Sequence, residues 1–184
     1  MRVRRAEPGD ALGIATVYVR SWQSAFRGLV PQSHLDAMSP EARVGGWAET
    51  LAATTWPRRG IFVLVDGTGL DGGGADPHGE IVTGFVTISP SRDDDADPGA
   101  VGEIQTLYLA PAAFGTGGGR LLVDAALGEL RRAGFEAVTL WVLDTNARAR
   151  RFYEHHGWRA DGATKLNDWG TFVRTDVRYV VALD

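Results

Sequence analysis

The chain has 184 residues, 44% of them hydrophobic and 23% charged, and its 19 Lys and Arg against 23 Asp and Glu give a formal net charge of −4. These values are typical of one soluble domain with a buried core. The mild acidity disfavours a protein that holds nucleic acid by neutralising phosphates. The absence of Cys excludes disulfides, thiolate metal sites and a catalytic thiol.

The chain also gives no sign of a metal site, a membrane segment or a secretory signal. Only two of its 4 His, His155 and His156, are adjacent, which disfavours a metal site. No stretch approaches the roughly 18 to 20 apolar residues of a membrane span, and no apolar segment follows the basic N-terminus. We therefore expect a single cytoplasmic domain, residues 1–184, with no metal, no membrane and no nucleic-acid partner.

The first half of the chain predicts three helices among short strands. A strand at Val3–Ala6 precedes helices predicted at Asp10–Ser24, through His34–Ala37, and from Ser39-Pro40-Glu41 to about Ala53. Further strands are predicted at Ile61–Val65, Glu80–Ser89 and Val101–Leu109, joined by loops at Gly67–Gly79 and Arg92–Gly99. Because no helix separates these three strands, we expect them to form an antiparallel meander.

The second half alternates helices and strands. After a Gly-rich turn it predicts a helix to about Ala133, a strand at Ala137–Val142, a helix at Thr145–His156, and strands near Trp158–Ala160 and Phe172–Leu183. The order strand, helix, strand predicts a right-handed crossover between two parallel neighbours. The fold class is therefore α/β, with a mixed sheet that is parallel only at the crossover.

The Gly-rich turn has the features of an anion-binding loop. It places Gly115–Gly119 directly before a helix, followed by Arg120 where an acidic residue would suit the helix better. N–H groups at a helix N-terminus lack helical partners, and glycines let the backbone approach a phosphate closely. A Walker A loop is excluded because no Gly-Lys-Ser/Thr follows, and the dinucleotide fingerprint fails because Arg120 and Leu122 stand where its last Gly belongs. A plain flexible turn in a Gly-rich chain is the alternative.

Three segments resemble the GNAT superfamily of acyl-CoA-dependent N-acetyltransferases. They are LYLAPAAFGTGGGRLL at 107–122, LWVLDTN with the following ARARRFYE at 140–154, and Gly157-Trp158. The resemblance is colinear over nearly all of the chain. It implies a mixed, mostly antiparallel sheet of about seven strands with helices on both faces and a central βαβ crossover. It also implies an acyltransferase that moves acetyl from acetyl-CoA directly to a primary amine of a small molecule or a protein N-terminus.

The resemblance further implies where acetyl-CoA binds. The backbone of Leu107, Tyr108 and Leu109 would pair with the pantetheine arm, and Asn146 and Tyr153 would contact it from the next helix. The diphosphate would lie on the loop, at Phe114, Gly115, Thr116, Gly117, Gly118, Gly119 and Arg120. Phe114 departs from the Gln or Arg usual at the first motif position and cannot donate a hydrogen bond. That contact must then come from backbone groups and Arg120.

Tyr153 and Glu103 are the catalytic residues that the resemblance implies. Tyr153 would donate to the departing sulfur, and its ordinary pKa of about 10 keeps it protonated at neutral pH. Glu103 would either accept the amine proton through water or bind the substrate cation, and a plain edge residue without either role is the alternative. By alternation along the strand, Glu103 is expected on the face of Leu107 and Leu109, although a bulge would change that parity. Asn146 could also cap its helix, which is compatible with a pantetheine contact.

A non-catalytic acyl-CoA-binding or sensor module is the alternative function. Phe114 favours it, whereas the presence of Tyr153 and Glu103 opposes it. The sequence does not identify the amine, and a homodimer through the last strands is a further possibility.

Overall fold

The computed structural model describes residues 1–67, 80–168 and 172–183. The predicted loop Gly67–Gly79 lies outside the described residues except for Gly67 itself.

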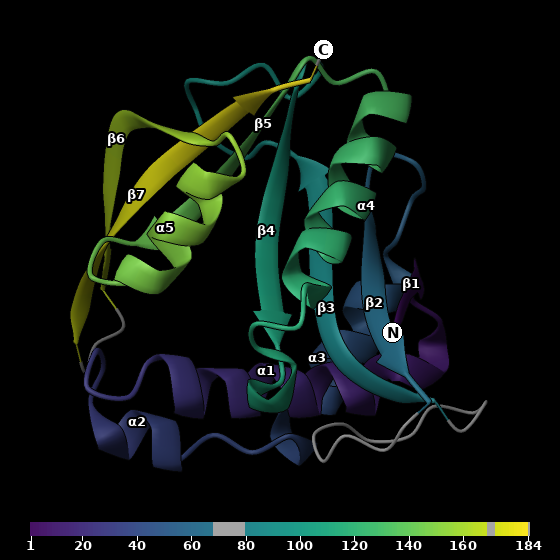
Figure 1. Ribbon diagram of the computed structural model, residues 1–184, viewed down its shortest axis with the longest axis vertical. Helices are drawn as coiled ribbons and strands as arrows, with labels where there is room; N and C mark the ends of the chain where they lie inside the picture. Colours follow the sequence, from purple (N-terminus) through teal and green to yellow (C-terminus); the bar gives the residue numbers. More distant parts are fainter. Residues whose placement is uncertain (68–79, 169–171, 184) are drawn as a thin grey trace.

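Seven strands form one mixed sheet in the order β1-β2-β3-β4-β5-β7-β6 (Figure 1). Their bounds are β1 Arg2–Arg5, β2 Gly60–Asp66, β3 Ile81–Pro90, β4 Val101–Leu109, β5 Ala137–Leu143, β6 Arg159–Asp168 and β7 Val173–Ala182. β4 and β5 are parallel neighbours, and the other neighbouring pairs are antiparallel. The predicted meander and crossover are confirmed.

Helices cover both faces of this sheet. The described residues contain five α-helices: α1 Ala11–Ala25, α2 Gln32–Asp36, α3 Glu41–Ala52, α4 Gly118–Arg132 and α5 Ala147–His155. Two short 3-10 turns, η1 Pro8–Asp10 and η2 Pro111–Ala113, lie before α1 and α4. Figure 1 shows α4 and α5 on one face, with α1 and α3 behind the sheet. No helix in the described ranges is long and apolar enough to cross a bilayer.

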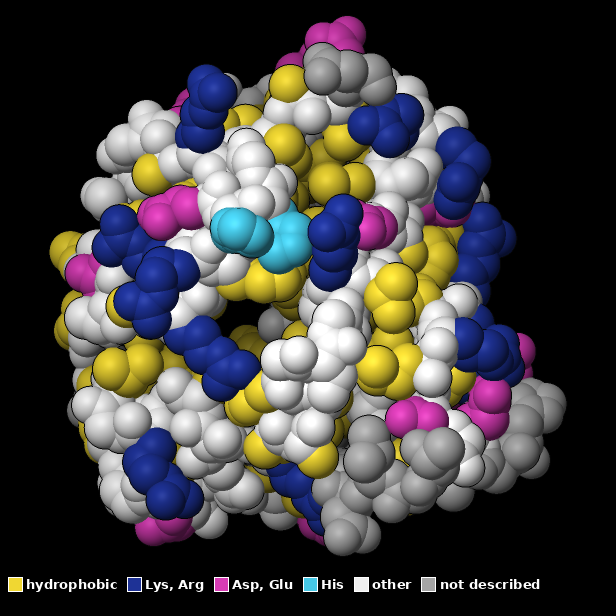
Figure 2. Space-filling view, in the orientation of Figure 1, with side chains coloured by type: hydrophobic (Ala, Val, Ile, Leu, Met, Phe, Trp, Pro, Cys, Tyr) yellow, Lys and Arg dark blue, Asp and Glu magenta, His cyan; other side chains and the backbone are white. Residues whose placement is uncertain are grey.

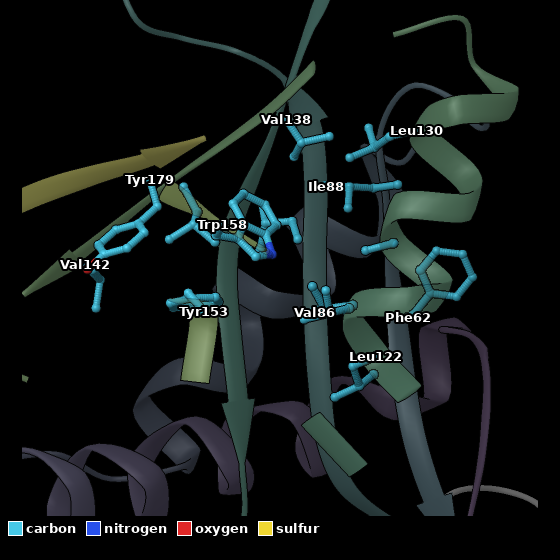
Figure 3. Packing of buried hydrophobic residues seen from close by; sticks show 14 of the residues in the cluster. Phe62, Val86, Ile88, Leu122, Leu130, Val138, Val142, Tyr153, Trp158 and Tyr179 are labelled. Carbon is cyan, nitrogen blue, oxygen red and sulfur yellow. The ribbon is translucent and has the colours of Figure 1, made fainter. Parts of the chain in front are cut away.

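The larger part of the core lies between α4, α5 and the sheet. Leu122, Ala126 and Leu130 recur every four residues on α4 and are fully buried, as an amphipathic helix requires. Figure 3 shows Leu122 and Leu130 facing Val86 and Ile88 of β3. A second cluster fills the opposite face, under α1 and α3. The βαβ unit formed by β4, α4 and β5 is thus stabilised by buried hydrophobic side chains on both faces of the sheet.

β6 is longer than predicted, because an apparent turn proves to be a bulge. Asp161-Gly162 has the composition of a turn, yet strand pairing resumes beyond it, from Thr164↔Val177 to Asp168↔Val173. Asp161 Oδ1 accepts the N–H of Ala163 at 2.9 Å, while its Oδ2 accepts Arg178 Nε at 2.7 Å. The irregular segment is therefore tied to β7, and the prediction of a strand ending at Ala160 is wrong.

Leu122→Ala should lower the free energy of unfolding by about 2–5 kcal/mol, because it leaves a cavity under α4. The neighbouring Leu121 is 43% exposed, and Leu121→Ala should change the same quantity by less than about 0.5 kcal/mol. Urea denaturation measures both variants. Equal losses would contradict the packing of α4 described above.

Candidate active site

The site is built where β4 and β5 separate. Their parallel pairing runs from Val101↔Ala137 to Ile104↔Leu140 only. Beyond that point β4 continues against β3, and β5 continues against β7. Figure 1 shows the two strands meeting near one end of the sheet and diverging toward the other. The divergence leaves an opening in the middle of the sheet.

A bulge in β4 decides which side chains face this opening. Ile104 pairs with Ile88 and Thr106 with Thr87, so Gln105 is an extra residue in β4. Glu103 therefore lies on the face of Thr106 and Tyr108, toward α1. Leu107 and Leu109 pack instead into the core under α4 and α5. The expectation from simple alternation, that Glu103 shares a face with Leu107 and Leu109, is wrong for this reason.

A cavity of about 470 Å³, here called the loop cavity, lies between the Gly-rich loop, the end of β4 and α5. Figure 2 shows the molecule hollowed between the positions of α5 and β4, with Lys or Arg side chains at the rim. Ten of the predicted CoA contacts line this cavity: Leu107, Tyr108, Leu109, Phe114, Gly115, Gly117, Gly119, Arg120, Asn146 and Tyr153.

Thr116 and Gly118 do not line the loop cavity. Thr116 Oγ1 donates to the carbonyl of Ala113 at 2.9 Å. A Cβ on Gly118 would overlap Leu64, so this position requires Gly for packing. Both residues fix the shape of the loop, and neither adds a side chain to the cavity wall.

The backbone at the start of α4 presents donors to the loop cavity. Gly117 has φ 88°, a left-handed conformation that glycine adopts without strain, and its carbonyl accepts Leu121 N–H at 3.2 Å as the helix begins. The N–H groups of residues 118–120 precede that bond and have no helical acceptor. The first turn carries no acidic side chain. The helix dipole and these N–H groups therefore favour an anion.

Tyr153 is positioned by the capping of α5. Asn146 Oδ1 accepts the N–H of Ala149 at 3.1 Å, so Asn146 is the N-cap, as predicted. The cap fixes the start of α5 and hence the direction of Tyr153 two turns later. Tyr153 is 8% exposed, and burial raises the pKa of its hydroxyl above its ordinary value. The phenol therefore stays protonated at neutral pH.

A smaller cavity of about 220 Å³, here called the charged cavity, adjoins the loop cavity. The two share six lining residues: Phe26, Leu107, Tyr108, Asn146, Ala149 and Tyr153. The rest of the lining is largely polar and carries two carboxylates and three cations, namely Glu103, Asp176, Arg92, Lys165 and Arg174. Two cavities of different character thus meet at Tyr153.

Glu103 is held by Arg92 at the wall of the charged cavity. Its carboxylate accepts Arg92 Nη2 at 3.0 Å and both the Nε and the backbone N–H of Arg92 at 3.2 Å. The Glu103 side chain is 3% exposed, whereas that of Arg92 is 63% exposed. The hydrogen bond to Glu103 raises the pKa of Arg92, although burial of the guanidinium opposes this shift.

Tyr108 forms an aromatic wall between the site and α1. Its hydroxyl accepts Trp22 Nε1 at 3.0 Å, and its ring meets that of Tyr18 edge-on at 5.4 Å. Burial raises the pKa of Tyr108. The Tyr108 hydroxyl is thus tied to α1 as an acceptor, and Tyr153 is the other phenol that lines both cavities.

The sequence profile of the Acetyltransferase (GNAT) family matches residues 21–158. The chain belongs to this family. It is 26% identical over 144 residues to the uncharacterized N-acetyltransferase YuaI of Bacillus subtilis, covering 78% of this chain and 72% of that protein. A 59-residue segment is 51% identical to mycothiol acetyltransferase of Beutenbergia cavernae, covering 32% of this chain but only 20% of that enzyme.

The fold is also that of solved GNAT structures. The structure of yncA from Salmonella typhimurium, solved with its cofactor acetyl-CoA, superposes with a TM-score of 0.67 at 18% identity, covering 100% of this chain and 94% of that one. The predicted enzyme class, an acyl-CoA-dependent N-acetyltransferase, is confirmed.

In this GNAT acetyltransferase, Arg148 stands beside the unusual Phe114. The guanidinium carbon of Arg148 lies 4.1 Å from the centre of the Phe114 ring, and both residues line the loop cavity. Arg120 is 70% exposed and pairs with Asp124 at 3.5 Å. Sequence reasoning missed Arg148, because only the docking of α5 brings it to the loop. Arg148 of α5 thus places beside the loop a positive charge that Phe114 cannot supply.

Gly117→Ala should raise the Kd for CoA about tenfold, because a Cβ at positive φ displaces the loop N–H groups. Gly134 is a matched control. It also has positive φ with open space around it, but it ends α4 away from the loop cavity. Both substitutions should cost about 1–2 kcal/mol of stability, and calorimetry should show weaker CoA binding for Gly117→Ala alone. Equal affinities would contradict a role of this loop in binding.

Proposed function

We propose that residues 1–184 form one N-acetyltransferase domain that moves acetyl from acetyl-CoA directly to a primary amine of a small molecule. The observation that carries the proposal is the meeting of the loop cavity and the charged cavity at Tyr153. Two substrates bound side by side need two such spaces and one shared wall. A protein that only bound CoA would need only the loop cavity.

The loop cavity suits the diphosphate and pantetheine of acetyl-CoA by its donors. The N–H groups at the start of α4, with Arg120 and Arg148, would hold the diphosphate. Past Ile104, the edge of β4 that faces β5 has no strand to pair with in the described residues. Backbone groups of Leu107 and Leu109 along that edge are available to the amides of the pantetheine arm.

Tyr153 is the proposed donor to the leaving sulfur. Transfer forms a C–N bond at the acetyl carbon and breaks the C–S bond, so negative charge develops on sulfur while the amine loses a proton to solvent. A protonated phenol in a buried site stabilises that charge by a hydrogen bond that strengthens as the bond breaks. The raised pKa of Tyr153 keeps this donor available.

Glu103 is proposed to act as an anchor rather than as a general base. A base has to receive the amine proton on a carboxylate oxygen, and both oxygens of Glu103 already accept hydrogen bonds from Arg92. In its place, Glu103 fixes Arg92 at the wall of the charged cavity. An amine that arrives as the free base needs no further proton acceptor in the protein.

Tyr153→Phe should lower kcat about 100-fold or more and leave the Kd for CoA almost unchanged, because the lost hydrogen bond becomes strong only as charge develops on the sulfur. Thiol release with a panel of amines measures kcat, and calorimetry measures Kd. Tyr179 is the control: it is buried, it lines neither cavity, and its hydroxyl donates to Glu154 at 2.6 Å. Tyr179→Phe loses hydrogen bonds to α5 but no group of either cavity, so it should reduce stability and lower kcat far less than Tyr153→Phe.

Two outcomes would count against this function. Unchanged kcat in Tyr153→Phe would remove the role of the phenol. Tight CoA binding by the wild-type protein, without thiol release for any amine, would favour the non-catalytic sensor.

A further inference from the structure

The charged cavity has one more cation than carboxylates. Glu103 pairs with Arg92, and Asp176 Oδ2 accepts Arg174 Nη2 at 2.9 Å. Within the described parts of the chain, the ammonium of Lys165 forms no ion pair and lies 4.2 Å from the centre of the Trp141 ring. Lys165 is half-buried and lines the cavity. The cavity therefore offers one positive charge to a ligand.

The same cavity contains a carboxylate oxygen without a donor. Asp176 is 2% exposed, and its Oδ2 accepts Asn167 Nδ2 at 2.7 Å in addition to Arg174. No group among the described residues donates to its Oδ1, which is itself buried. A buried carboxylate oxygen without a hydrogen bond is unfavourable, and an N–H donor from a ligand would relieve this.

Strand register puts these two groups next to each other. Asp176 of β7 is the partner of Leu143 on β5 and of Lys165 on β6, so the three side chains lie in one row on one face of the sheet. Directly paired residues have Cβ atoms about 5 Å apart. A cation and an N–H acceptor are thus neighbours, yet they form no ion pair with each other. A ligand that carries an amine and an anion a few atoms apart matches both.

We propose that the acceptor is a small amino-acid-like molecule, with its carboxylate on Lys165 and its amine on Asp176 Oδ1. This inference rests on the proposed acetyltransferase function. The volume of about 220 Å³ lies below the ~300–1,000 Å³ usual for small-molecule sites, which suits a head group of few atoms. Lys165 and Asp176 then determine which acceptor binds, while Tyr153 donates to the leaving sulfur.

The test uses sets of three compounds with the same side chain: an L-amino acid, its carboxamide, and the amine that lacks the carboxyl group. Thiol release from acetyl-CoA gives kcat/KM for each compound with the full chain. In the best set, the acid should exceed the two compounds without a carboxylate by about tenfold or more, because only the acid pairs with Lys165.

Single substitutions test which residues cause the preference for the acid. Lys165→Met should lower kcat/KM for the acid about tenfold and change that for the carboxamide less than about twofold. Asp176→Asn should weaken all three compounds, because each presents the same amine. Arg159→Met is the matched control, since Arg159 is an exposed cation on the same strand that lines neither cavity. It should leave every value unchanged, and the Kd for CoA should stay the same in all three variants.

The outcomes separate this inference from the function on which it rests. Equal or better turnover of the two compounds without a carboxylate, or equal losses for acid and carboxamide in Lys165→Met, would overturn the inference while acetyl transfer stands. Thiol release with no compound in these sets or in a wider amine panel, despite CoA binding, would overturn both.

Discussion

The parallel pairing of β4 with β5 ends after Ile104↔Leu140, and the rest of the site depends on that limit. Each strand keeps its other neighbour beyond this point, so the sheet stays intact while its middle opens. The opening gives a polar ligand access to the interior without unpaired backbone being buried in the core. It also gives the loop cavity and the charged cavity a common wall.

The helix that crosses this opening is held firmly. Arg150 on α5 donates to the carbonyl of Asp144 at 3.0 Å and to the hydroxyl of Tyr179 at 3.2 Å. Trp158, buried beneath α5, lies 5.8 Å from Tyr153 between ring centres (Figure 3). These contacts fix Tyr153 without using its hydroxyl. The proposed donor, held in this way, would need little reorganisation when charge develops.

Much of the fold and part of the site can be predicted from local sequence. The Gly-rich loop before α4, the cap at Asn146 and the position of Tyr153 follow from neighbouring residues, and they were predictable. The face of Glu103 was not, because it depends on one extra residue in β4. The extent of β6 was hidden by Asp161-Gly162, whose composition is that of a turn although it forms a bulge.

The remaining site residues depend on contacts between distant segments. Arg148 reaches Phe114 only when α5 docks beside the loop, and Lys165 meets Asp176 only through the register of β6 with β7. Spacing along the chain carries no signal for either pair. The residues that follow from local sequence are thus those proposed to bind acetyl-CoA. The residues that strand register brings together are those proposed to distinguish acceptors.

The most direct test of this account is a crystal structure of the protein with CoA. It should show the diphosphate on the N–H groups of residues 118–120 and the sulfur within hydrogen-bonding reach of Tyr153 Oη, where the two cavities meet. A sulfur held away from Tyr153, or CoA bound outside the opening between β4 and β5, would contradict the account.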